Sequence, residues 1–157
     1  MQRLCILLSI LVMLPGCSRQ DKKPTPVVQV VNPGPPQHWT MEDFLGEYSL
    51  LGDADDFYAQ FRETPGCSFG MVRARERLSA RSHREHDLVL YVHSGNARFN
   101  VGGRDYTAVT GDVVYIPRGL KYSAESSDGN PLDFFTVYYP PFKGEDIIYH
   151  EPPAEKQ

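Results

Sequence analysis

The chain has 157 residues, enough for one domain with a hydrophobic core and too few for two domains of ordinary size. Apolar residues make up 41% and charged residues 23%, which excludes a coiled coil, a collagen-like chain and a wholly disordered chain. The formal net charge of −4 at pH 7 argues against nucleic-acid binding, which needs a basic surface, so we expect no nucleic-acid partner. The 13 glycines and 13 prolines favour many turns and therefore an all-β domain.

The first residues are typical of a targeting signal. An apolar run from Ile6 to Leu14 has the length of a secretory signal core and is too short to span a bilayer. It ends in Leu14-Pro15-Gly16-Cys17, which resembles the bacterial lipobox. This resemblance implies that residues 1–16 are removed and that Cys17 carries several acyl chains, palmitate among them, which anchor the protein to a membrane. An ordinary cleaved signal peptide is the alternative.

The residue after Cys17 indicates where in the cell the protein is anchored. Ser18, rather than aspartate, follows Cys17, which resembles outer-membrane sorting in Gram-negative lipoproteins. We therefore expect the protein in the bacterial cell envelope, lipid-anchored at the periplasmic face of the outer membrane.

The mature chain is predicted to begin with a linker. Residues 17–38 hold five prolines and are expected to form a disordered, extended tether behind the lipidated cysteine. Alternatively, the valines within residues 27–31 add an edge strand to the following domain. That domain is assigned to residues 39–150, and residues 151–157 are expected to be a frayed tail.

The domain is predicted to start with a short helix. Trp39 to Leu45 follows a helical pattern in which Thr40 serves as the N-cap. The acidic residues Asp53, Asp55 and Asp56 are interpreted as a surface loop.

Short apolar runs between turn residues then predict a series of strands. Eight are expected: Ser68–Arg75, Ser79–His83, Leu88–His93, Ala97–Val101, Arg104–Val109, Asp112–Ile116, Lys121–Ala124 and Asp133–Tyr139. Gly102-Gly103 gives the tightest hairpin prediction, because adjacent glycines permit the positive φ angles of a type I′ turn. Eight strands in one domain suggest a barrel.

Glycine and proline recur at set spacings in this region, at Gly95, Gly111, Pro117 and Gly119. This spacing resembles the two motifs of the cupin superfamily, with Gly95 at the end of the first motif and the other three residues in the second. The resemblance covers roughly Ser68 to Asp146 and implies an all-β, cupin-type jelly-roll barrel. It also makes a homodimer a reasonable expectation, because cupins often pair through sheet edges.

The family usually binds a metal ion through three histidines and one glutamate. Counting back from Gly95, the first motif's two histidine slots fall on Arg81 and His83 and its glutamate slot on Leu88, while the last histidine slot falls on Tyr122. Only His83 keeps a ligand of the expected type.

Two interpretations of this degenerate site remain open. In the first, no cofactor binds, and Arg81, His83, His86 and Tyr122 converge in the barrel mouth, where the guanidinium favours an anionic small molecule. In the second, His83, His86 and Tyr122 hold a divalent transition metal, namely Fe, Mn or Zn. His86 is expected to point inward by the alternation of a strand extending back from Leu88.

Three functions follow from this sequence. The favoured one is a membrane-tethered, cupin-fold binding module for a small, anionic molecule. The alternative is a metal-dependent periplasmic enzyme, a dioxygenase, isomerase or lyase. An envelope protein that uses the barrel surface to contact other proteins is the third.

Overall fold

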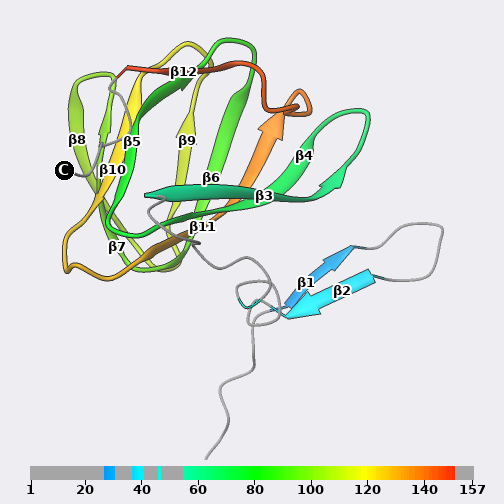
Figure 1. Cartoon of the computed structure of the whole chain (residues 1–157), viewed down its shortest axis with the longest axis horizontal. Coiled ribbons are helices and arrows are strands. Elements are labelled where there is room, and N and C mark those ends of the chain that lie inside the picture. The colour runs from blue at the N-terminus through cyan, green and yellow to red at the C-terminus, as the bar shows by residue number, and fades with distance from the viewer. Residues whose placement is uncertain (1–26, 31–36, 41–45, 47–54, 151–157) are drawn as a thin grey trace, which may run out of the picture. The chain divides into compact units, whose positions relative to one another are not determined.

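The computed structural model describes residues 27–30, 37–40, 46 and 55–150. The chain divides into two compact units, Met1–Phe44 and Leu45–Gln157. In the first unit, β1 (Val27–Val30) pairs antiparallel with β2 (Gln37–Thr40) in a two-stranded sheet (Figure 1).

This small sheet corrects two expectations about the N-terminal region. The valines do form a strand, but it pairs with β2 instead of extending a sheet of the following domain. Trp39 and Thr40 belong to β2, so the helix prediction is wrong for its first two residues. Aromatic and β-branched side chains favour strands, which explains the difference.

Several N-terminal and C-terminal predictions fall outside the described residues. They concern the signal peptide at residues 1–16, the lipidated Cys17, the rest of the helix at residues 41–45 and the tail at 151–157. Within the part that the structure does describe, no helix has the length and apolar character needed to cross a membrane.

The second unit contains two five-stranded antiparallel sheets, which confirms the all-β barrel (Figure 1). One sheet has the strand order β12-β5-β10-β7-β8 and the other β3-β4-β11-β6-β9. The strands are β3 (Asp56–Glu63), β4 (Ser68–Ala74), β5 (Arg77–His83), β6 (Asp87–Ser94), β7 (Asn96–Val101), β8 (Arg104–Val109), β9 (Val113–Ile116), β10 (Tyr122–Ser126), β11 (Leu132–Tyr139) and β12 (Ile147–Tyr149).

The eight predicted strands correspond to β4 through β11, whereas β3 and β12 were not predicted. Asp56 begins β3, so its assignment to a loop was wrong. Phe57, Ala59 and Phe61 alternate along this strand, a signal that the neighbouring acidic residues obscured.

The predicted hairpin at Gly102-Gly103 is confirmed. Val101 of β7 pairs with Arg104 of β8, and the two glycines between them have φ angles of 59° and 82°. Both angles lie in the left-handed region that a type I′ turn requires and that glycine adopts without strain.

Buried apolar side chains from both sheets fill the space between them. Phe99 of β7 contacts Phe134 of β11 edge to face, with ring centroids 5.5 Å apart, so this pair joins the two sheets. Gly70 of β4 lets β3 approach closely, because a Cβ at this position would meet the ring of Tyr58 and lie 2.6 Å from the Ala59 carbonyl oxygen. This approach brings β3, and with it Asp56, against the barrel.

Candidate functional site

Strand β5 directs two polar side chains into the barrel. Arg81 and His83 are two residues apart and share one face of the strand. Arg81 lies opposite Tyr122 of β10 on one side and Tyr149 of β12 on the other. Cross-strand partners share a face, and Tyr122 belongs to the buried core, so both β5 side chains point inward.

Arg81 is neutralised by the protein itself. Its guanidinium forms an ion pair with the Asp56 carboxylate, and its Nε donates a hydrogen bond of 2.9 Å to the Ser79 carbonyl oxygen. It also lies over the ring of Tyr149, 5.0 Å from the centroid. Burial acts to lower the pKa of Arg81, but the charge of Asp56 outweighs it and the pKa is raised.

His83 lies between a phenol and a carboxylate. Its Nε2 is 3.0 Å from the Tyr122 hydroxyl, and its Nδ1 is 3.2 Å from Oδ1 of Asp146. Only 2% of the His83 side chain is exposed, and this burial lowers its pKa despite the nearby carboxylate. Burial also raises the pKa of Tyr122 well above its usual value. Tyr122 is therefore a neutral phenol at physiological pH.

His86 reaches the same place from the connection between β5 and β6, not from a strand as expected. Its Nδ1 is 2.5 Å from Oδ2 of Asp146, and its Nε2 is 3.0 Å from the carbonyl oxygen of Pro141. The same carboxylate accepts a 3.0 Å hydrogen bond from the Glu85 backbone N–H. Burial would raise the pKa of Asp146, but hydrogen bonds from His86, Glu85 and His83 outweigh it and the pKa is lowered.

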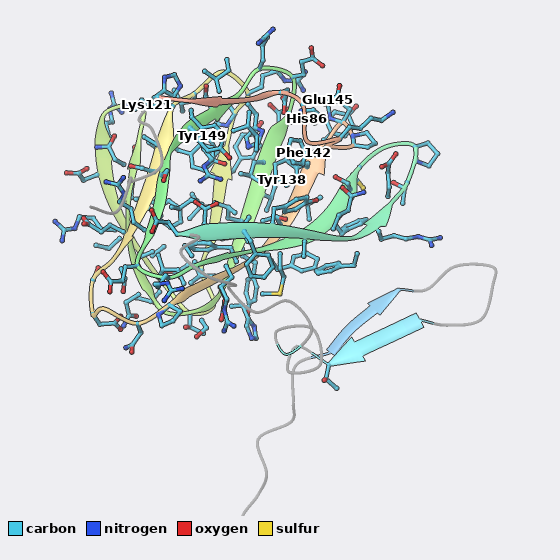
Figure 2. The ribbon with its side chains drawn as sticks, in the orientation of Figure 1. His86, Lys121, Tyr138, Phe142, Glu145 and Tyr149 are labelled. Atoms are coloured by element: carbon cyan, nitrogen blue, oxygen red, sulfur yellow. The ribbon has the colours of Figure 1, made fainter. Side chains whose placement is uncertain are left out.

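Aromatic rings surround the two histidines. Phe142 contacts both imidazoles edge to face, with ring centroids 5.3 Å from His83 and 5.4 Å from His86. Tyr138 stacks on Phe142 at 4.6 Å. Figure 2 shows His86, Phe142 and Tyr138 gathered at one end of the barrel. These aromatic rings limit the access of water to the imidazoles and so strengthen the polar contacts of both histidines.

The structure thus brings together all four residues singled out from the sequence, Arg81, His83, His86 and Tyr122. It does not form the four-residue metal site usual for cupins, because Leu88 at the glutamate slot belongs to the apolar core. Asp146 contacts Nδ1 of both histidines, whereas the Tyr122 hydroxyl contacts Nε2 of His83.

Asp146 was not predicted as a site residue. One ring nitrogen of each histidine and an oxygen of this carboxylate lie within 4.8 Å of one another, so His83, His86 and Asp146 could hold a metal ion. Asp146 occupies no cupin motif position and lies about 60 residues from its partners along the chain. It lies directly before β12, one residue from the backbone partner of His83, and because β12 was not predicted, this proximity could not be seen in the sequence.

A separate hollow lies between β8 and β9, the edge strands of the two sheets. It has a volume of about 640 Å³, within the usual range for small-molecule pockets. Its lining residues include Val101, Arg104, Tyr106, Val114, Tyr115 and Leu120.

The fold defines the class of protein: a cupin-type barrel with a buried polar cluster inside it. Residues 69–151 match the AraC-like ligand binding domain, and because this match covers more than half of the chain, the chain belongs to that family.

Solved structures support the same fold. An uncharacterized conserved protein with a double-stranded β-helix domain from Klebsiella pneumoniae superposes with a TM-score of 0.58 and 20% identity, over 68% of this chain and 94% of that chain. The cupin domain of Cnp3 from Schizosaccharomyces pombe gives a TM-score of 0.53 and 15% identity, over 75% of this chain and 88% of that chain.

One curated relative has a higher sequence identity to this chain than these two solved structures have. Mannose-1-phosphate guanylyltransferase 2 of Escherichia coli O157:H7 is 31% identical over 81 residues, or 52% of this chain. The match spans only 17% of that enzyme's length.

Proposed function

We propose that this protein is a binding module for a small, anionic organic molecule, which it takes up in the hollow between β8 and β9. The family to which the chain belongs is a ligand-binding domain. The observation that carries the proposal is a hollow of suitable size lined by an arginine and two tyrosines, in which the one aspartate, Asp112, accepts a hydrogen bond from the Val109 backbone N–H.

The chemistry of the hollow favours an anion with an apolar or ring-shaped body. Arg104 is exposed; it lies opposite the half-buried Val101 and shares one face of β8 with the buried Ala108. Arg104 forms no ion pair with another residue that the structure describes, and a guanidinium binds a carboxylate or phosphate through charge-assisted hydrogen bonds. The apolar side chains of Val114 and Leu120 provide contact area beside it.

The polar cluster around Arg81 is less suited to this role. Its guanidinium already has an anionic partner in Asp56 and is almost fully buried. A ligand that replaced Asp56 would leave that carboxylate unpaired, at a cost of several kcal/mol, about as much as the new ion pair would contribute. The anion preference expected from Arg81 is therefore assigned to Arg104.

A sugar phosphate combines the anion and the ring, and it makes a suitable first probe. The curated relative is named for mannose 1-phosphate, although the match covers a small part of that enzyme. Inorganic phosphate and benzoate serve as probes for the anion alone and for a carboxylate with an apolar ring.

Isothermal titration of the full-length protein with mannose 1-phosphate and benzoate tests the proposal. We expect saturable binding of at least one probe at one site per chain, weakened at least tenfold by Arg104→Gln. Arg98→Gln is the matched control, because Arg98 is an exposed β7 residue that does not line the hollow. Equal binding by the wild-type protein and Arg104→Gln, or binding of neither probe, would contradict the proposal.

The membrane anchor is the second part of the proposal. The lipobox-like sequence ending in Cys17 supports a module held in the bacterial envelope, at the periplasmic face of the outer membrane. A fixed position suits capture of a ligand or delivery to a neighbouring protein.

A further inference from the structure

We infer that His83, His86 and Asp146 form a metal site that takes one Zn²⁺ or a similar divalent transition metal. Of these three residues, only His83 falls at a usual cupin ligand position, whereas His86 and Asp146 do not. The inference is independent of the hollow between β8 and β9, because none of the three residues lines that hollow.

The donor atoms suit such an ion. Two imidazole nitrogens and one carboxylate oxygen are a common ligand set for zinc sites that keep a fourth position for water. The two Nδ1 atoms lie 3.2 Å and 2.5 Å from the oxygens of Asp146. Ligand atoms around tetrahedral Zn²⁺ lie about 3.3 Å apart, so small side-chain rotations would suffice.

The outer nitrogens of both rings are already fixed. Nε2 of His86 faces the carbonyl oxygen of Pro141 at 3.0 Å, and Nε2 of His83 faces the Tyr122 hydroxyl at 3.0 Å. Histidines that bind metals usually donate their second ring N–H to a carbonyl, carboxylate or water, which orients the ring. The structure therefore turns both Nδ1 atoms toward the same carboxylate.

The polarity of these hydrogen bonds supports the inference. A carbonyl oxygen only accepts, so Nε2 of His86 carries the hydrogen. A metal ion that binds here would displace the hydrogen between Nδ1 of His86 and the Asp146 carboxylate oxygen, two atoms that lie 2.5 Å apart, and release it as a proton.

The site is accessible to an ion from one side. His83 is nearly closed off, but 8% of the His86 side chain and 10% of the Asp146 side chain are exposed. Arg81, the nearby cation, is neutralised by Asp56, which reduces its repulsion of a metal ion. A metal can therefore enter past His86 without passing through the apolar core.

Isothermal titration of metal-stripped, full-length protein with ZnCl₂ tests this inference. We expect one Zn²⁺ per chain with micromolar or tighter affinity. His86→Gln and Asp146→Asn should each weaken binding at least a hundredfold. The control is His93→Gln, because His93 is not a member of the cluster and its loss should leave the affinity within twofold of the wild-type value.

A second readout identifies the ligands directly. Co²⁺ bound to the wild-type protein should give the intense visible absorption of a four-coordinate ion, and this absorption should be absent in Asp146→Asn.

Circular dichroism of each variant without metal shows whether it folds. If either substitution unfolds the chain, Asp146→Glu, which retains a carboxylate, should keep the Co²⁺ spectrum. Absence of binding by the folded wild-type protein, or unchanged binding by His86→Gln, would overturn the inference.

Discussion

Asp56 at the start of β3 forms an ion pair with Arg81 on β5, inside the barrel and between strands of different sheets. The motif register aligns Arg81 with a histidine position of the cupin pattern, and Asp56 neutralises the Arg81 charge inside the barrel. The pair therefore explains how a permanent cation is accommodated at this position.

Removing the acidic partner should destabilise the fold. In Asp56→Asn, the Arg81 guanidinium stays charged and nearly buried, so we expect the free energy of unfolding to fall by about 3 kcal/mol. Urea denaturation measures this loss. Asp55→Asn, one residue before β3, should change stability by less than about 0.5 kcal/mol.

The double variant shows whether the pair itself is responsible. Asp56→Asn with Arg81→Met should be more stable than the sum of the two single effects predicts. Simple additivity would show that Asp56 contributes through something other than Arg81.

Thr136 on β11 offers a site for stabilisation. Its side chain is completely buried, and its hydroxyl has no hydrogen-bond partner within the described region. Thr136→Val removes this unsatisfied group while keeping nearly the same shape, so we expect a gain of about 1 kcal/mol.

Thermal unfolding is the measurement, and about 1 kcal/mol corresponds to roughly 4–8 °C in Tm for a domain of this size. Thr136→Ser keeps the hydroxyl and loses the methyl group, so its Tm should fall. A valine variant that melts below the wild-type protein would show that the hydroxyl has a partner.

Asp87 provides a pH-dependent prediction. Hydrogen bonds from the side chain and backbone N–H of Arg118 lower the pKa of Asp87 to about 2. The folded-state pKa of Asp87 lies below its ordinary value of 3.8. The hydrogen bonds from Arg118 therefore stabilise the fold at pH values above 3.8, and this stabilisation is lost as the pH falls toward 2.

The carboxyl carbon resonance of Asp87 reports this titration in an NMR experiment. Arg118→Gln should move the pKa of Asp87 upward toward 3.8 while retaining part of the shift, because the backbone N–H remains. Arg98→Gln should leave it unchanged. A midpoint near 3.8 in the wild-type protein would disprove the interaction.

Much of the fold was predictable because it depends on local patterns. Alternating apolar residues and turn glycines are enough to locate β4 through β11 and the hairpin at Gly102-Gly103. Strand β3 was missed because acidic residues precede its apolar alternation. Its role depends on the close approach at Gly70, which no local pattern shows.

The site was predictable only in part. Motif register places Arg81, His83 and Tyr122 on the barrel interior, and the structure agrees. The partners of these residues come from distant segments: Asp56 from β3 and Asp146 from the segment before β12. A single sequence does not reveal which distant carboxylate satisfies which buried cation or imidazole.

The membrane anchor is tested by fractionation. We expect the wild-type protein to sediment with bacterial outer membranes and to incorporate labelled palmitate. Cys17→Ser should abolish labelling, and the protein should then be released or remain unprocessed. Cys67→Ser is the control, because Cys67 lies within the barrel unit and should not affect labelling. A wild-type protein found entirely in the soluble periplasm would contradict the anchor.

The central claim, that a small anion binds between β8 and β9, is tested most directly by an NMR titration of ¹⁵N-labelled protein with mannose 1-phosphate and benzoate. We expect at least one probe to shift the backbone amides of Arg104, Tyr106, Val114 and Leu120 most strongly, and these shifts should disappear in Arg104→Gln. Shifts that concentrate around Arg81 and His83 instead, or no saturable shift with either probe, would contradict the account.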